Sequence, residues 1–552
     1  MLLEAGPAAP DELKINVPGM KGSTLGTVYD WNFTTVPQTH VKDRVFTAPR
    51  GKVLGGSSAL NLMTWDRASE GEYDAWEELG NPNWNWDSMI HYMKKVENFT
   101  GANTPTYGSE GVGFKGPLQT VINRFIPEQQ LLWIPTVEGL GVPKNLESLG
   151  GNPIGVMWQP SSVEPTHYHR SYSANSYLPI AGSNLVVLTN TRVAKINLVK
   201  SGKQQRATGV TLSDGTVINA WSEVILSAGT IQSPGLLELS GIGQASVLKK
   251  AGIKQKIELP GVGENLQDHV RVQTSYQLKP GFTSFDILRY NATYAAEQLQ
   301  LWKDNQFSRY DYTGSAYTFV NWDQIGVSST MVPLAKKAAA ASKSVTVHKQ
   351  LEYARDKAVP QVEVIFSDGY TGSKGYPPAT SPLFGINLFS LIIGIMHPFS
   401  RGNVHISSSD PDVKPTLNPN YFSNEHDIQA ATEAIKFARR IATSAPLSGA
   451  WVSEYEPGLD VIPGNGTGTA QDAAWRNFAL DTSASIFHPV GTCAMLPLAK
   501  GGVVDARLVV HGTKNLRVVD ASVIPLIVSA HIQTAVYGIA EFAAEMIIKR
   551  PC

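Results

Sequence analysis

The chain has 552 residues and a formal net charge of -1, from 46 Lys and Arg against 47 Asp and Glu. This balance gives no electrostatic reason to expect a nucleic acid or an anionic membrane as partner. With 42% hydrophobic residues the chain can bury a substantial core, which argues against intrinsic disorder. Its two cysteines, Cys493 and Cys552, provide neither a disulfide framework nor a thiolate metal cluster.

Apolar runs and glycosylation sequons bear on where the protein is found. The longest apolar run, residues 383–396, is interrupted by Asn387 and Ser390 and is shorter than the ~20 residues of a membrane helix, so we predict a buried strand there. No signal peptide is visible at the N-terminus. Four acceptor sequons nevertheless favour a secreted glycoprotein, and they begin at Asn32, Asn98, Asn291 and Asn465.

The predicted elements of the first half begin with a strand end. Residues 2–6 are typical of a buried strand that closes on the carboxylate of Glu4. An extended stretch follows to Arg50, then a Gly-rich loop over residues 51–61 and a Trp-rich helical segment to about residue 98. Further strands are then predicted at 185–188, 194–198, 207–212, 216–220 and 223–227, with a hairpin turn at Asp214-Gly215.

The second half mixes strands and helices. We expect a helix around 335–343, an amphipathic helix over 425–444, a strand at 516–519 and a last helix from about 531 to 548. The first and last segments therefore share one sheet around a mixed middle. This order predicts an α/β and α+β chain, in which a Rossmann-like dinucleotide-binding domain is interleaved with a domain built on an antiparallel sheet with helices.

Two glycine-rich stretches could approach a bound group closely. In the loop 51–61, adjacent glycines and serines can direct amide and hydroxyl donors at a polar cofactor, although a plain turn has the same pattern. Residues 229–243 follow a strand end, and Ser233 with Pro234 predicts the start of a helix. The stretch 260–268 looks like a dinucleotide fingerprint but fails, because Leu266 replaces the third glycine.

Two histidines are candidates for acid–base chemistry. His488 lies between Phe487 and a proline, and His531 is expected to open the last helix, whose positive end favours an anion. Taken singly, each is as typical of a packed histidine as of a catalyst. The sequence lacks a nucleophile elbow, a P-loop and a zinc-protease motif, and His167 and His169 have no third ligand, so no metal site is predicted.

Taken together, these motifs resemble the glucose-methanol-choline (GMC) family of FAD-dependent oxidoreductases. Both family signatures match, at 51–68 and 229–243. The stretches around 260–269, 398–402, 488–492 and 519–541 match as well, in the order and spacing of the family. The likeness is nearest to the fungal aryl-alcohol oxidase and glucose oxidase-like branches. It implies an FAD-binding domain of residues 1–65, 181–270 and 500–552, and a substrate-binding domain of residues 66–180 and 271–499.

The resemblance also implies the roles of individual residues. His488 would take the hydroxyl proton of an alcohol while its hydride passes to the flavin, and His531 would hold the same hydroxyl. Phe487 would line the pocket and favour a primary aromatic or allylic alcohol. The residues expected at FAD are Glu4 at the adenosine ribose, Val193 at the adenine, Gly55, Ser58 and Asn61 along the pyrophosphate and flavin, Asp520 and Ala521 near the ribityl chain, and Gln533 and Thr534 near the flavin pyrimidine.

Two departures from the family qualify these expectations. Leu60 replaces a histidine that some members bind covalently to the flavin, so the FAD is expected to be non-covalent. Family members also carry a first strand, a Gly-x-Gly-x-x-Gly turn and a helix, about 30 residues that would precede Met1. We therefore expect the natural start to lie upstream.

Three functions remain open at this stage. The first is oxidation of a small alcohol, with oxygen or a quinone-like acceptor taking the electrons. The second is a lyase or cyclase in which FAD is structural. The third is a vestigial protein with impaired flavin binding.

Overall fold

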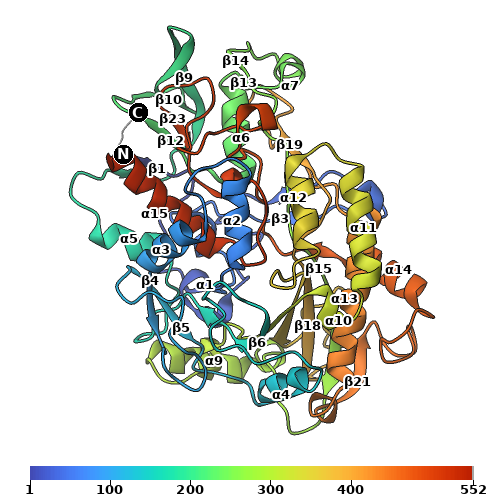
Figure 1. Cartoon of the computed structure of the whole chain (residues 1–552). Coiled ribbons are helices and arrows are strands. Elements are labelled where there is room, and N and C mark those ends of the chain that lie inside the picture. Colours follow the sequence, from blue (N-terminus) through green and yellow to red (C-terminus); the bar gives the residue numbers. More distant parts are fainter. Residues whose placement is uncertain (550–552) are drawn as a thin grey trace.

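A computed structural model describes residues 1–549, and the chain folds around two systems of sheets (Figure 1). The first contains two parallel pairs, β1 (Leu2–Leu3) with β8 (Val187–Leu188) and β12 (Val224–Leu226) with β23 (Leu516–Val518). Beside them lies an antiparallel sheet of β9 (Val193–Ser201), β10 (Gln204–Leu212) and β11 (Val217–Asn219). The predicted hairpin at Asp214-Gly215 is confirmed, since it joins β10 to β11 and Gly215 has a φ of 88°.

Three helices cover this first system. They are α2 (Glu70–Glu78), α3 (Trp86–Val96) and α15 (Gln533–Lys549), and Figure 1 shows α15 beside the other two although it comes from the far end of the chain. Gly538 allows α15 to approach α3 closely, because a Cβ there would stand 2.8 Å from Cγ of Met93. The final helix thereby fixes the segment in front of it, which carries His531.

The second system is a seven-stranded antiparallel sheet. Its strands are, in order, β21 (Trp451–Glu456), β15 (Val270–Leu278), β18 (Leu388–Ile395), β17 (Val362–Asp368), β16 (Ala316–Val320) and β6 (Gly155–Trp158), with β22 (Ala484–Ser485) paired to the start of β15. The apolar run 383–396 supplies β18, as predicted. The 19-residue helix α13 (Glu425–Thr443) packs its apolar side on β15 and β18.

Three predicted helices begin at other residues than expected. Helix α6 (Gly229–Leu239) begins at Gly229, and Pro234 lies inside it. Ser233 is not an N-cap: its hydroxyl donates to Asp520, 2.6 Å away, and this tertiary bond replaces the predicted local one. Helix α15 begins at Gln533, so His531 precedes the helix. The helix predicted around 335–343 is longer and earlier, α11 (Ser328–Ala340).

Buried apolar side chains form two large clusters. One joins side chains from segments 68–93, 196–262 and 490–543, and the other joins segments 41–46, 133–158 and 270–480. The domain boundaries themselves stay a prediction.

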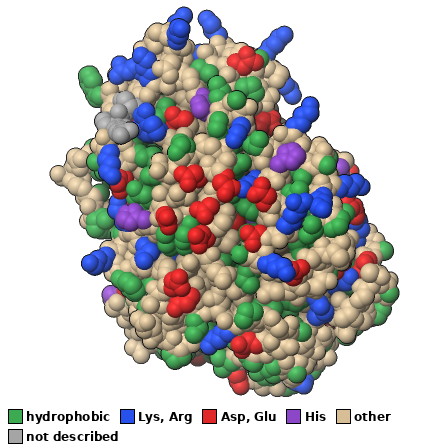
Figure 2. Space-filling view, viewed as in Figure 1, with side chains coloured by type: hydrophobic (Ala, Val, Ile, Leu, Met, Phe, Trp, Pro, Cys, Tyr) green, Lys and Arg blue, Asp and Glu red, His purple; other side chains and the backbone are tan. Residues whose placement is uncertain are grey.

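No helix within residues 1–549 has the length and apolar character to cross a bilayer. Figure 2 shows charges of both signs on one face of the molecule, with acidic side chains gathered over α2, which contributes Glu70, Asp74, Glu77 and Glu78.

Candidate active site

The two candidate catalytic histidines lie against each other between the two sheet systems. The ring centroids of His488 and His531 are 4.8 Å apart, with the ring planes at 78°. A third imidazole, that of His269, contacts His488 from the other side, with 3.0 Å between the two Nδ1 atoms. His269 and His531 thus meet His488 at one point of the fold, although they are 219 and 43 positions from it in the sequence.

Asp268 holds the loop that carries His488. One carboxylate oxygen of Asp268 accepts from the His488 backbone N–H at 2.8 Å, and the other accepts from the hydroxyls of Ser485 and Tyr421. Phe487 adopts a left-handed backbone, with a φ of 70°, which is unfavourable for a bulky residue. Its carbonyl accepts from Arg50 at 2.5 Å. These contacts hold the strained turn that directs His488 into the site.

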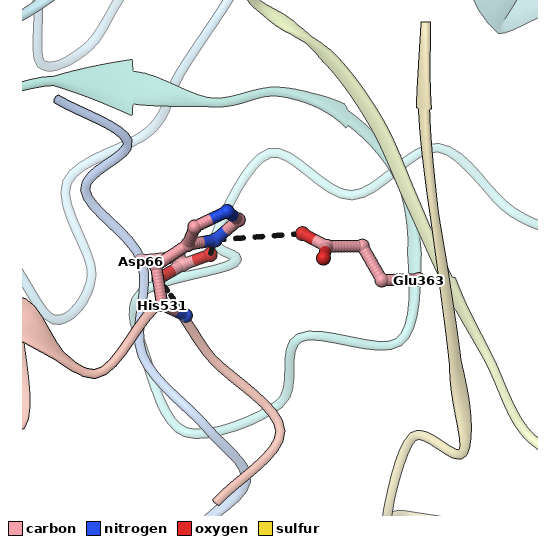
Figure 3. Close-up of side chains that lie close together, drawn as sticks. All are labelled: Asp66, Glu363 and His531. Atoms are coloured by element: carbon pink, nitrogen blue, oxygen red, sulfur yellow. Dashed lines mark hydrogen bonds and ion pairs between the residues drawn. The ribbon is translucent and has the colours of Figure 1, made fainter. Parts of the chain in front are cut away.

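His531 is held by two carboxylates, and Figure 3 shows both of them reaching the same ring nitrogen. Asp66 accepts from both the backbone N–H and Nδ1 of His531, each at 2.8 Å, and Glu363 lies 3.5 Å from the same Nδ1. Both carboxyl side chains are almost fully buried, and they come from segments far apart in the chain. With Nδ1 donating to Asp66, Nε2 of His531 is left for a ligand.

Electrostatics separates the two imidazoles. Burial, followed by the charges of His531 and His269, holds the pKa of His488 well below its ordinary value. Burial also opposes the charged form of His531, but Glu363 and Asp66 outweigh it and raise its pKa to about 9. At neutral pH the site therefore contains a neutral imidazole beside an imidazolium. Burial, and then the charge of Asp66, raises the pKa of Glu363 itself to about 7, against the opposing effect of His531.

The segment before α15 is tied to the segment around α2. Glu72 accepts from the backbone N–H and the hydroxyl of Ser529, and Gln533 donates to the Thr64 carbonyl. The Asn61 side chain donates to Gln533 at 2.7 Å and accepts from Arg170 at 2.7 Å. Predicted flavin residues from the two ends of the chain are therefore in direct contact.

The other residues predicted at the cofactor come from separate segments of the chain. The Ser58 hydroxyl donates to the Gly55 carbonyl at 2.6 Å, and Asp520 accepts from the Gly229 N–H at 2.9 Å. Glu4 follows β1 and accepts from the Gly6 N–H at 2.7 Å. Burial raises the pKa of this carboxyl. Val193 begins β9, Ala521 begins the 3-10 turn η9 (Ala521–Val523), and Thr534 lies in the first turn of α15.

These residues fit an FAD. Gly55 has a φ of 102°, and a Cβ there would collide with the Tyr172 ring at 2.7 Å, so this backbone must be bare. Next to Gly56 and Gly229, by contrast, open space lies where a side chain would stand. The buried Thr534 Oγ1 has no hydrogen-bond partner within residues 1–549. This is expected of a polar group that bonds to a ligand. Leu60, where some relatives carry the tethering histidine, packs in an apolar cluster.

Three site residues were missed by the sequence analysis: Asp66, His269 and Glu363. Asp66 and His269 lie inside motifs that had been recognised, but nothing in those motifs distinguished them. Glu363 had a usable signal, because it is a carboxylate near the start of β17, flanked by Val362 and Val364, and only 1% exposed. A buried charge in such a strand requires a partner, and here the partner is His531.

The fold and this site define an FAD-dependent oxidoreductase that acts on CH–OH donors, and the comparisons agree. Two family models match the chain, both described as GMC oxidoreductase, one over residues 20–271 and the other over residues 398–540. A GMC oxidoreductase family protein of Malassezia sympodialis, Mala s 12, is 36% identical over 99% of this chain and 88% of its own length. The chain therefore belongs to the GMC oxidoreductase family.

Other relatives span several activities. Pyranose dehydrogenase 3 of Leucoagaricus meleagris is 30% identical over 100% of this chain and 88% of its own length. Among solved structures, an FAD-dependent oxidoreductase of Chaetomium thermophilum aligns with a TM-score of 0.87 and 27% identity, over 99% of this chain and 94% of that one. A fungal aryl-alcohol oxidase aligns with a TM-score of 0.84 and 27% identity, with the same coverage.

Proposed function

We propose that this enzyme oxidises a primary aromatic or allylic alcohol to the aldehyde, with His488 as the base and His531 as the group that holds the hydroxyl oxygen. The observation that supports it most is the contact between a neutral and a charged imidazole at one point of the fold. The partly buried Phe487 next to the base supports the aromatic preference.

The two histidines divide the proton chemistry. A neutral His488 that donates from Nδ1 to His269 has its Nε2 lone pair free to accept the hydroxyl proton. The His531 imidazolium donates from Nε2 to the same oxygen and stabilises its developing negative charge. An alkoxide releases hydride more readily than an alcohol, so the two groups act on one step. When bound, FAD supplies the ring that accepts this hydride.

The roles of the cofactor residues are those that the family pattern implies for these positions. Glu4 would accept from the ribose hydroxyls, and Gly55, Ser58 and Asp520 would lie along the phosphate and ribityl parts. Asn61, Gln533 and Thr534, with Val193 and Ala521 further out, would complete the binding site. Because the Leu60 side chain forms no bond to a flavin, acid precipitation should release all of the FAD into the supernatant, as absorbance at the flavin band would show.

We also propose an electron acceptor and a location for the protein. Oxygen or a quinone would take the electrons in the second half of the cycle, and stopped-flow mixing of the reduced enzyme with each would identify the acceptor. Three of the four sequon asparagines, Asn32, Asn291 and Asn465, are exposed and accessible to a glycosyltransferase, which supports secretion as a glycoprotein.

Anaerobic titration tests the function. The holoenzyme should lose its oxidised flavin absorbance when an aromatic or allylic alcohol is added, and release one aldehyde per flavin. A chain that binds FAD but keeps its absorbance with aryl, allylic, sugar and aliphatic alcohols would instead support the lyase or cyclase. Purified protein that stays colourless after FAD is added would support the vestigial protein.

A further inference from the structure

Lys21 is a lysine of the catalytic region that forms no ion pair with an acidic group of residues 1–549. Its ammonium lies over the Tyr312 ring, with Nζ 4.9 Å from the ring centroid. Within residues 1–549 it forms neither a hydrogen bond from Nζ nor an ion pair; the acidic group that acts on it electrostatically is Asp368. Asp368 is itself occupied by the Phe285 N–H and by Gln129 and Arg309.

The position of Lys21 is fixed by backbone packing. It directly follows the 3-10 turn η1 (Pro18–Met20), which lies against the turn η6 (Arg309–Asp311). Gly19 makes this contact possible, because a Cβ there would be 2.7 Å from Cα of Tyr310. Tyr312 is fixed in turn, since its hydroxyl accepts from Gln130 and from the Asp368 N–H, both at 2.9 Å. The backbone of Lys21 and the aromatic ring under its ammonium are therefore both held in place.

Contacts connect Lys21 to the catalytic pair. A Cβ placed on Gly314 would be 3.3 Å from Nζ of Lys21 and 3.7 Å from the Tyr317 hydroxyl, so the two polar groups border the same small space. The Tyr317 ring lies 6.0 Å from the His531 ring, and its hydroxyl is hydrogen-bonded to Thr64 at 2.7 Å. Tyr317 thus lies near both Lys21 and His531.

On the other flank, Lys21 adjoins the predicted flavin loop. Gly22 lies against the Leu62 side chain, which directly follows Asn61 and is 43% exposed. Burial, and then the positive charge of Arg170, lowers the pKa of Lys21 to about 7. A bound anion would offset both effects and restore the charged form, so the site is electrostatically suited to a negative group.

We propose that Lys21 is the anion-binding residue of the substrate site, and that the preferred alcohol carries a carboxylate remote from its carbinol. This inference rests on the proposed function and specifies its substrate class. The ammonium would pair with the carboxylate, Tyr317 and Tyr312 would contact the body of the substrate, and the carbinol would reach His488 and His531.

Binding of non-reacting analogues tests the role of Lys21 without turnover. Calorimetric titration of the FAD-loaded enzyme with 4-methylbenzoate and 4-methylbenzamide should show tighter binding of the carboxylate. Lys21→Met should raise the Kd of 4-methylbenzoate roughly 10- to 100-fold, as expected for a lost charged hydrogen bond. The Kd of the amide should not change, which also shows that the variant is folded. Lys21→Arg should keep the preference, and Lys14→Met, which removes an exposed cation nearby, serves as the matched control.

Turnover then connects the anion site to the reaction. The wild type should oxidise 3- or 4-(hydroxymethyl)benzoate with a higher kcat/KM than the corresponding amide, and Lys21→Met should abolish this ratio. Equal Kd values for 4-methylbenzoate in the wild type and in Lys21→Met would overturn the proposal, as would a wild type without preference for the carboxylate. If binding follows Lys21 but no alcohol is oxidised, the anion site stands and the proposed function fails.

Discussion

His488 is buried, the side chain of His531 is 12% exposed, and their rings are in contact, yet their pKa values move in opposite directions. The difference lies in their neighbours. Around His488 are two further imidazoles and Arg50, and its Asp268 contact is made by the backbone, whereas the ring of His531 lies between Asp66 and Glu363. Burial alone would make both rings neutral. Two buried carboxylates reverse this for one ring and give each imidazole its own task.

Removal of the neutral partner should have the largest effect. His488→Ala deletes the proton acceptor, and we expect kcat/KM to fall roughly 10²- to 10⁴-fold. FAD content should be unchanged, because His488 is not among the residues assigned to the cofactor. Steady-state kinetics and flavin absorbance measure both quantities, with His167→Ala, an exposed histidine, as the control. Activity near the wild-type level in His488→Ala would disprove the assignment of the base.

Removal of the carboxylate that is hydrogen-bonded to the charged partner should have the next largest effect. Asp66→Asn keeps the size of the side chain but loses the charge that faces His531 Nδ1, so we expect kcat/KM at pH 8 to fall on the order of tenfold to a hundredfold. The fall should be smaller at pH 6, where His531 is protonated even without the full set of carboxylates. A loss of equal size at both pH values would indicate a merely structural role for Asp66.

The second carboxylate should matter less. Glu363 lies 3.5 Å from His531 Nδ1, against two contacts of 2.8 Å for Asp66, and its own pKa of about 7 leaves it partly protonated at neutral pH. We therefore expect Glu363→Gln to lower kcat/KM at pH 8 by less than Asp66→Asn does. Comparison of the two variants at one substrate concentration series is sufficient, and the reverse order would mean that Glu363 carries most of the effect.

The smallest expected effect is a shift of one limb of the pH profile of kcat/KM, which distinguishes the roles of the two rings. His531 loses its proton as the pH rises through about 9, so the wild-type kcat/KM should decline above that value. His488 must be neutral to act as a base, and its lowered pKa places the acid limb below about 6.5, the ordinary histidine value. In Asp66→Asn the alkaline limb should move to lower pH while the acid limb stays. Movement of the acid limb would contradict the separate roles.

Much of the secondary structure could be predicted from local sequence patterns. The strands around Asp214-Gly215 and the helix α13 follow from alternation, turn chemistry and helical periodicity, which act within one segment. The start of α6 did not follow, because Ser233 bonds to Asp520 rather than to its own helix. Of the site, the two histidines were found because they lie in recognisable motifs. Asp66 and Glu363 were not found, since their roles depend on a contact with His531, 465 and 168 residues away, which only the folded chain creates.

The account can be tested most directly by observing the protons on the two rings. In holoenzyme labelled with ¹⁵N-histidine, nitrogen chemical shifts at pH 7, assigned with His488→Gln and His531→Gln, distinguish a neutral imidazole from an imidazolium. We predict a neutral His488 and a protonated His531 that loses its proton near pH 9. A neutral His531 at pH 7, or a charged His488, would contradict the division of labour between them.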